Sequence, residues 1–478
     1  MFNFSCPCGM PERGDYPTLS GKNNRVRYLL FFAFIGCHNG LIAQQWHPLF
    51  DGKTLDGWEI HGGSARFEVV DGTIRGTATD DRQNTFLCTE ARYGDFIFEV
   101  SMLLPNALNS GIMFRADLRE AHDRVYGYQC EVDPSPRAWT GGLYDEARRG
   151  WLYPLTRNEA AQDAFRLGTW NTIRIEALGP EVRTYVNGRM TSRLVDSLSR
   201  EGFFGLQVHG IGGSMGEAGY TVSWRDPKIC LTEVAAHRRV PDPQVPEISY
   251  LPNRLTDWQR DHGWRLLWDG RTPEGWRGAK RSDFPPSGWT IADGVLTVEA
   301  TDGGEATGPG DIVTERPYGD FELQLEFQLT EGANSGIKYF VDPNLNRGAG
   351  SAIGCEFQLL DDQRHPDAER GVAGNRTLGA LYDLIPPASL QNAGRGKQFK
   401  GIGQWNHARI VSRNGHVEHW LNHEKVVEYD RFAQVFAALV NYSKYQRWPN
   451  FGRWPQGAIL LQDHGDTVRF RSIYIREW

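Results

Sequence analysis

Two segments of the sequence place ionisable side chains on strand faces that would otherwise be apolar. Side chains of a β-strand alternate between its two faces. In CEFQLLD (residues 355–361), Glu356 and Gln358 therefore point away from the apolar side chains, and Glu131 and Asp133 share a face of YQCEVD in the same way. A carboxylate on an inner strand costs free energy unless it has a partner. We expect either an open groove that uses these groups for acid–base chemistry or a closed polar network, and the sequence leaves both open.

Two histidines stand in matching motifs later in the chain. LQVHG contains Gln207 and His209, and LQDHG contains Gln462 and His464, so each glutamine shares a strand face with a histidine. A histidine close to a glutamic acid can act as a general base with an acid partner. We expect both histidines to line the groove, with a structural hydrogen-bonded network as the alternative.

The motifs GGLYD and GALYD end in a tyrosine followed by an aspartate. The first continues as EARRGWLY, so Tyr144 is followed closely by Arg148 and Trp151. Forked arginine donors beside an aromatic ring suit a sugar, because a pyranose ring stacks on aromatic faces while its hydroxyl groups accept and donate hydrogen bonds. The alternative is a hydrogen-bonded loop anchor. Tyr382 is the corresponding tyrosine of the second motif.

Two features occur only in the second half of the chain. DDQRHPD brings Asp361, Asp362 and His365 together, side chains that could bind a divalent cation, although the spacing matches no specific metal loop and a solvated loop is the alternative. A segment containing NYSKYQRWPNFGRW includes Lys444 and Trp448. Such an aromatic loop suits a rim over a groove, or a structural loop at a sheet edge.

The sequence contains an internal repeat. Residues 90–114 and 315–339, at an offset of 225, are identical at ten of twenty-five positions and share YGDF and NSGI. Other landmarks follow in the same order in both halves, which indicates a duplicated domain. The same offset relates Glu131 to Glu356 and Cys130 to Cys355. We expect YGDF and NSGI to be scaffold that frames the site without belonging to it.

Composition and patterning predict an all-β protein with two domains. The 478 residues exceed an ordinary single domain, and 54 glycines with 12% aromatic residues favour short strands and tight turns. Alternating runs around Asp-Gly and Asn-Gly indicate hairpins. We expect two tandem jelly-roll β-sandwiches, residues 44–230 and 263–478, joined by a proline-rich linker at residues 231–262. The net charge of −7 gives no electrostatic reason to expect nucleic acid or an anionic membrane.

The N-terminal segment is typical of an export signal. Basic residues precede a short apolar run and then small residues, so we expect residues 1–43 to be a leader that is cleaved after Ala43, with lipid attachment at Cys37 as the alternative. No later segment is apolar enough to cross a bilayer. A periplasmic, outer-membrane-associated or extracellular location follows. The four cysteines after the leader lack disulfide or metal-ligand spacing, and we expect them to be buried and unpaired.

The combined motifs resemble the 3-keto-disaccharide hydrolase domain family. LFDGKTLDGW, YGDFIFEV, NSGIMF, GTWNTIRI, GNRTLGALYDLIPP and ILLQDHGD carry the resemblance, which covers both halves. It implies concanavalin-like jelly rolls, bacterial export, and cleavage of glycosides that carry a ketone at C3. No cofactor follows with certainty, and a divalent metal ion is an option. The resemblance is fullest in the second half, where it suggests the catalytic residues Glu356, Asp361, Tyr382, Lys444 and His464.

A ketone at C3 makes the proton on C2 acidic, so a base can remove it and the C1 substituent can leave by elimination, after which water adds. This requires a base, a donor for the enolate and an acid for the leaving oxygen. The first half lacks the DDQRHPD loop and the aromatic segment, so it is a second active site or a binding domain. A non-catalytic, lectin-like protein is the alternative for the whole chain. The predicted substrate-binding residues are Gln358, Trp448, Glu131, Asp133, Tyr144, Arg148, Trp151 and His209.

Overall fold

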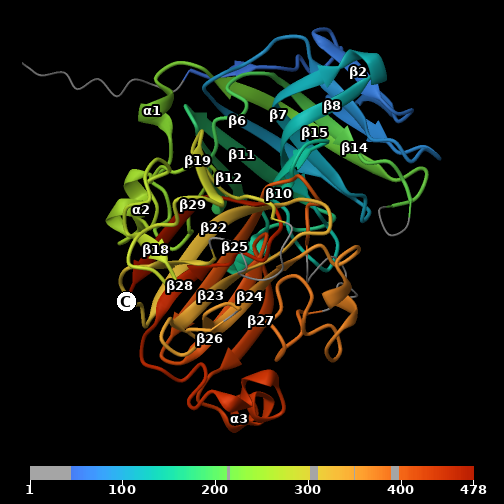
Figure 1. Ribbon diagram of the computed structural model, residues 1–478. Helices are drawn as coiled ribbons and strands as arrows, with labels where there is room; N and C mark the ends of the chain where they lie inside the picture. Colours follow the sequence, from blue (N-terminus) through green and yellow to red (C-terminus); the bar gives the residue numbers. More distant parts are fainter. Residues whose placement is uncertain (1–44, 213–215, 302–309, 349, 389–397) are drawn as a thin grey trace, which may run out of the picture. The chain divides into compact units, whose positions relative to one another are not determined.

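The structure, a computed structural model, describes residues 45–212, 216–301, 310–348, 350–388 and 398–478. The expected leader and its Cys37 lie outside these residues. The described chain consists mainly of strands in four sheets, two in each half, and the prediction of two tandem jelly-roll β-sandwiches is confirmed (Figure 1).

The first sandwich contains a nine-stranded and a seven-stranded sheet among the described residues. In spatial order the larger sheet contains β16 (Ile248–Ser249), β13 (Arg189–Val195), β12 (Glu181–Val186), β11 (Trp170–Leu178), β6 (Phe96–Leu103), β15 (Thr221–Cys230), β4 (Thr73–Thr77) and β3 (Arg66–Val70), with β1 (His47–Pro48) beside β15. The smaller sheet contains β10 (Gly150–Tyr153), β9 (Leu143–Glu146), β8 (Arg124–Val132), β7 (Ser110–Arg119), β14 (Phe203–Val208), β5 (Thr85–Thr89) and β2 (Trp58–Gly62).

The second sandwich repeats this plan with eight and five strands in the described part of the chain. Its larger sheet contains β19 (Trp289–Ala292), β20 (Val295–Val298), β29 (Val468–Glu477), β22 (Phe321–Leu329), β25 (Asn406–Arg413), β26 (His416–Leu421) and β27 (Glu424–Asp430), with β17 (Arg265–Leu266) beside β29. The smaller sheet contains β18 (Trp276–Gly278), β21 (Ile312–Thr314), β28 (Ala458–Leu461), β23 (Asn334–Asp342) and β24 (Ile353–Leu360).

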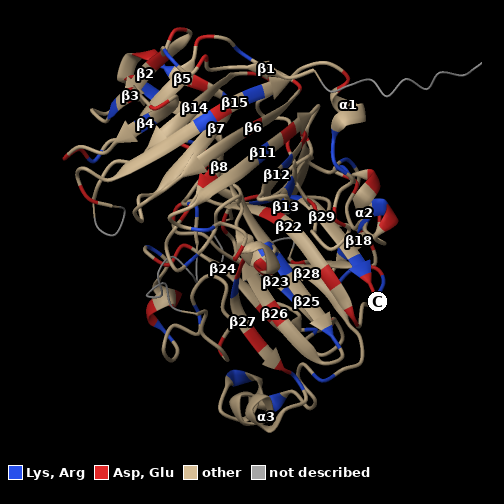
Figure 2. Ribbon diagram, turned by 180° about the vertical axis from the view of Figure 1, so that it is seen from behind, with Lys and Arg blue, Asp and Glu red and all other residues tan. Residues whose placement is uncertain are grey.

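The α-helices of the described chain are short. They are α1 (Val234–His237), α2 (Asp257–Asp261) and α3 (Gln434–Asn441). None is long and apolar enough to cross a membrane. The eight-residue α3 was not predicted; it belongs to the extra segment of the second sandwich and buries Phe436 and Val440. Acidic and basic residues are interspersed over the described strands and loops (Figure 2).

Each core lies between the two sheets of its sandwich. In the first, Phe98 of β6 stacks on Phe204 of β14 with ring centres 4.4 Å apart. In the second, Phe321 of β22 contacts Tyr339 of β23. The predicted hairpins form where Asp-Gly and Asn-Gly adopt the left-handed conformation, as at Asn187, whose φ is 50°. Since one face of each smaller sheet is occupied by the core, its polar side chains project from the other face.

The four residues of the NSGI motif have different structural roles. Its serine fixes strand pairing, because Ser110 donates a hydrogen bond to the Gln207 carbonyl and Ser335 to that of Gln462. Its isoleucine packs in the core. Its glycine leaves room for a polar neighbour: a Cβ on Gly111 would lie 2.2 Å from Gln129 Nε2, and one on Gly336 2.1 Å from Glu356 Oε1. The asparagine reaches polar side chains on the next strand, so the motif takes part in the site as well as in the scaffold.

The strand register corrects one prediction. Gly111 pairs with Glu131 on β8, whereas its counterpart Gly336 pairs with Gln358 on β24. Glu131 therefore corresponds to Gln358, and Gln129 corresponds to Glu356. The offset of 225 is wrong on this strand by two residues, and Cys130 likewise does not correspond to Cys355. All four cysteines of the described chain are buried and unpaired, as expected.

Arg115 is a buried cation at the bulge of β7. Its guanidinium donates to the carbonyls of Gly94 and Gly179 at 2.9 and 2.8 Å and to the Asp95 carboxylate at 3.0 Å. Its φ of 45° lies in the left-handed region, and the register of β7 against β8 shifts here. Arg115 thus ties the bulge to the start of β6 and the end of β11.

We predict that Arg115→Met lowers the free energy of unfolding by about 2–4 kcal/mol, because two carbonyls lose their donors. Arg92→Met is the matched control: its ion pair with Asp117 is about half exposed and is worth at most about 1 kcal/mol. Thermal and urea unfolding would measure both. Equal losses for the two variants would contradict this account of Arg115.

Candidate functional site

A polar groove lies on the outer face of the smaller sheet of the first sandwich. One cavity of 310 Å³ is lined by Asn109, Gln129, Glu131, Tyr144 and Trp151 among others. A second cavity of 360 Å³ shares Asn84, Glu146 and His209 with it. The two cavities therefore adjoin along strands β8, β9 and β14, and together they define what we call the first groove.

Glu131 lies in the wall of this groove and is only 5% exposed. Its carboxyl group accepts hydrogen bonds from Asn109 Nδ2 at 2.7 Å and from Gln129 Nε2 at 3.3 Å. Burial raises the pKa of Glu131 to about 8, against the lowering effect of the Asn109 hydrogen bond. The group is thus a neutral acid at pH 7, able to donate a proton.

His209 faces the same groove, and its tautomer leaves Nε2 able to accept a proton. Its Nδ1 lies 2.6 Å from the Gly210 carbonyl, so Nδ1 must donate and Nε2 carries the lone pair. Burial lowers the pKa of His209, which keeps the ring neutral. Burial also raises the pKa of Glu146, so the groove contains two carboxyl groups that resist ionisation beside a neutral imidazole.

Two aromatic rings, those of Tyr144 and Trp151, line the first groove. Trp151 contacts Tyr144 at 5.2 Å and Trp139 at 4.7 Å between ring centres. Arg148 donates to the buried carboxylate of Asp145 at 2.7 Å, as in the loop-anchor alternative, and its role in sugar binding stays a prediction. Asp133, also predicted to bind substrate, forms an ion pair with Arg137 at 2.7 Å.

The second sandwich arranges its acid differently. Glu356 is 5% exposed and its Oε2 lies 3.6 Å from Lys338 Nζ, on the facing strand β23. An ammonium at this distance favours the carboxylate form. The first sandwich has Met113 at the position of Lys338. Gln358 donates to the Asn334 side-chain oxygen at 3.1 Å, as the counterpart of the Asn109–Glu131 contact.

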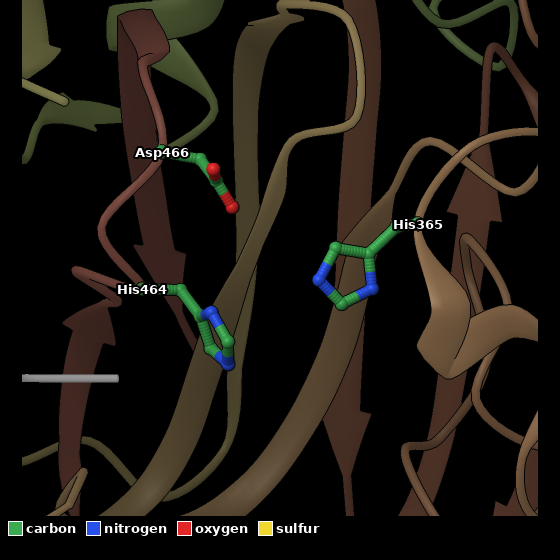
Figure 3. Close-up of side chains that lie close together, drawn as sticks. All are labelled: His365, His464 and Asp466. Carbon is green, nitrogen blue, oxygen red and sulfur yellow. The ribbon is translucent and has the colours of Figure 1, made fainter. Parts of the chain in front are cut away.

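His464 lies at the end of this polar row beside a second histidine and a carboxylate. The ligand-type atoms of His365, His464 and Asp466 all lie within 4.8 Å of one another; His464 and Asp466 lie on the loop between β28 and β29, and His365 lies on another loop (Figure 3). Asn334 Nδ2 lies 3.3 Å from His464 Nε2 and donates to it, which leaves the proton of the neutral ring on Nδ1. Asp466 is anchored by the Asn334 backbone N–H at 3.0 Å.

This cluster is one of two in the described chain whose atoms lie close enough to hold a metal ion, the other being His416, Glu418 and Glu428, and one hydrogen bond opposes metal binding at the first. His365 Nδ1 accepts from the Asp367 backbone N–H at 3.2 Å, so Nε2 of the neutral ring carries the proton and offers no lone pair to a cation. Asp361 and Asp362 take no part, because they accept hydrogen bonds from Gly332 and Leu378 backbone N–H groups. As positioned, the cluster suits proton transfer better than cation binding.

Tyr382 lies beside Glu356, and Lys444 contacts Tyr382. The Tyr382 backbone N–H donates to the Glu356 carbonyl at 3.1 Å, and the Tyr382 hydroxyl donates to Asp367 at 2.7 Å. Lys444 Nζ lies 4.3 Å from the centre of the Tyr382 ring. Trp448 packs against the core of the second sandwich, although it is only partly buried.

Several residues of both sites were not predicted. They are Asn109, Gln129 and Glu146 in the first sandwich, and Asn334, Lys338 and Asp466 in the second. A signal was present for the asparagines, because NSGI is unchanged in both halves. In the second half the motif is followed by KY, whose lysine is Lys338, whereas in the first half it is followed by MF. The lysine in place of a methionine indicated that the two sites differ.

The profile of one family matches both halves of the sequence. The family is described as the 3-keto-alpha-glucoside-1,2-lyase-like domain, and the match covers residues 45–230 and 263–476. The chain belongs to this family. It carries the domain twice, and each copy includes one of the two polar faces described above.

Parts of the chain are also similar to individual known proteins. A protein described as a 3-keto-disaccharide hydrolase, from Bacteroides thetaiotaomicron, is 36% identical over 234 residues, which cover 45% of this chain and 78% of that protein. A solved structure described as a glycosyl hydrolase, from Parabacteroides distasonis, is 28% identical and matches 48% of this chain and 99% of its own, with a TM-score of 0.41. A carbohydrate-binding module from Bacillus subtilis is 17% identical over 36% of this chain and 95% of its own, with a TM-score of 0.27.

We predict that replacing the neutral acid Glu131 by Gln changes the pH dependence of stability. The pKa of Glu131 is about 8 in the folded protein against 4.5 in an unperturbed chain. Its contribution to stability is therefore complete below pH 4.5 and is lost as the pH rises to 8. Relative to Glu131→Gln, the wild type loses about 1.4 kcal/mol per pH unit in this window and nothing further above it.

Thermal unfolding of both proteins between pH 5 and 9 measures the difference. Glu68→Gln, on the exposed side of β3, is the control and leaves the wild-type pH dependence unchanged. A constant difference between Glu131→Gln and the wild type across this range would show that Glu131 is ionised throughout.

Proposed function

We propose that this protein is a carbohydrate-active enzyme that cleaves the glycosidic bond of 3-keto-glycosides by elimination, with the centre of cleavage in the second sandwich. Family membership over both halves supports the substrate class, together with the relative described as a 3-keto-disaccharide hydrolase. The observation that carries the chemistry is the row of Glu356, Asn334 and His464 beside a carboxylate, Asp466.

His464 is the proposed base for the proton on C2. In this proposal Asn334 turns from His464 to the substrate, and the freed Nε2 removes the proton. The Asp466 carboxylate, within 4.8 Å, then stabilises the imidazolium. The electron pair of the C2–H bond first forms an enolate with the C3 oxygen. When the C3 ketone re-forms, this pair becomes the C1=C2 double bond and the bond from C1 to the leaving oxygen breaks.

In this proposal, a lysine ammonium and a side-chain amide stabilise the negative charge of the enolate. Lys444 is the proposed cation, since the Tyr382 hydroxyl is committed to Asp367. Glu356 takes a proton from the Lys338 ammonium and then donates it to the leaving oxygen. Asp361, predicted from the resemblance as a catalytic residue, is left out of the chemistry because its carboxylate accepts backbone hydrogen bonds. Export to the periplasm or beyond, on the pattern of residues 1–43, would bring the enzyme to oxidised sugars outside the cytoplasm.

The test compares a 3-keto-disaccharide with the same disaccharide before oxidation. We predict release of a monosaccharide from the ketone alone, and a loss of about 10²-fold or more for His464→Asn. His416→Asn, at a half-exposed position of β26, is the matched control and keeps full activity. Equal cleavage of the unoxidised sugar, or full activity of His464→Asn, would contradict the proposal.

A non-catalytic sugar-binding protein is the second candidate, favoured by the aromatic wall at Trp151 and Tyr144. Binding of the 3-keto-disaccharide by the wild type with no turnover under any condition would support it. Under the enzymatic proposal, Glu356→Gln instead loses turnover and retains affinity for the sugar.

A further inference from the structure

We propose that the first groove is a second active centre that adds water to the unsaturated 3-keto sugar released by elimination, with Glu131 as the acid and His209 as the base. This rests on the proposed function, which supplies the unsaturated sugar. The two copies of the domain then perform successive steps, and their sum is the hydrolysis of the glycoside.

The acid of the first groove differs from that of the second sandwich by position and by partner. It stands two residues further along its strand, where the Asn109 and Gln129 side-chain amides donate to it. Met113 occupies the position of Lys338, so no ammonium faces this strand from β7. Removing a proton from C2 builds up negative charge, which a cation stabilises, whereas adding water to a conjugated ketone requires a proton donor at the ketone oxygen. The first groove offers the donor.

The charged groups around Glu131 leave it in the neutral form. Asp133 is paired with Arg137 at 2.7 Å, and burial raises the pKa of Glu146 above its ordinary value. With its own pKa near 8, Glu131 is protonated at neutral pH before any ligand arrives. A protonated carboxyl group in an apolar setting is a known means of hydrogen-bonding a developing oxyanion.

The groove also offers a base, an acceptor and room for one sugar ring. His209 Nε2 carries a lone pair because Nδ1 donates to the Gly210 carbonyl. Gln129 lines the groove, and its Oε1 is buried with no hydrogen-bond partner among the described residues, so a rotation of this amide toward the cavity would let Oε1 accept from the C2 hydroxyl of the ligand. The 310 Å³ cavity is at the lower end of ligand pockets, which are about 300–1,000 Å³. That size fits one ring on the Trp151 wall with a water molecule.

The step balances without any other reactant. The water oxygen forms a bond to C1 while His209 Nε2 takes one of its protons. The C1=C2 electron pair moves to give the enol, whose C3 oxygen receives a proton from Glu131. The imidazolium then protonates C2, the C3 ketone re-forms, and Glu131 recovers its proton. The net change is the addition of water across C1=C2, with no oxidation or reduction.

The experiment supplies the full-length protein with chemically prepared unsaturated 3-keto sugar and follows the loss of its conjugated ultraviolet absorbance. We expect the wild type to hydrate it faster than buffer alone, and Glu131→Gln and His209→Gln to lose about 10²-fold of this rate. Since Glu131 is protonated, Gln preserves its shape and the fold, which thermal unfolding checks. Glu68→Gln, on the exposed side of β3, is the matched control and retains the wild-type rate of hydration.

A parallel assay measures monosaccharide release from the 3-keto-disaccharide, so the two proposals fail in different ways. No release by the wild type would overturn the elimination proposal while hydration could still be measured. Hydration by the wild type at the rate of buffer, or at an unchanged rate in both Glu131→Gln and His209→Gln, would overturn the proposal for the first groove.

Discussion

The charge of a carboxyl group buried on the face of a sheet has to be neutralised, either by a proton or by a cation. The way in which each site neutralises this charge determines which other side chains the site contains. A proton neutralises Glu131, which is surrounded by side-chain amides, while the ammonium of Lys338 pairs with Glu356. Burying either carboxylate alone would cost several kcal/mol. The first solution produces a proton donor, and the second produces an ion pair. Duplicated sheets thus present different chemistry from nearly the same backbone.

The backbone permits this divergence because the NSGI strand tolerates either arrangement. Its glycine leaves space for the side chain of Gln129 in the first copy and of Glu356 in the second. Its asparagine forms a hydrogen bond with Glu131 in the first copy and with Gln358 in the second. Exchange of Glu and Gln between two positions on the same face moves the acid along the strand while keeping every side chain on its side of the sheet. A change of one residue would instead have moved the acid into the core.

Much of the fold could be predicted from the sequence, because alternation, Asp-Gly and Asn-Gly turns and the repeat are local or internal signals. They predicted the β3–β4 and β11–β12–β13 hairpins and the polar faces that contain Glu131 and Glu356. They could not predict the register, since the bulges at Arg115 and Phe340 and the exact pairing of β7 with β8 depend on tertiary contacts. For the same reason the partners Asn109, Lys338 and Asp466, which are distant in sequence, were missed, as were the backbone hydrogen bonds that the Asp361 carboxylate accepts.

The contrast between the two acids is tested most directly by observing their protonation. Nuclear magnetic resonance of protein labelled with ¹³C at the glutamate carboxyl carbons reports each titration. The account predicts a glutamate that titrates at about pH 8, absent from Glu131→Gln and still present in Glu356→Gln. A spectrum in which Glu131→Gln removes no signal titrating above neutral pH would contradict it.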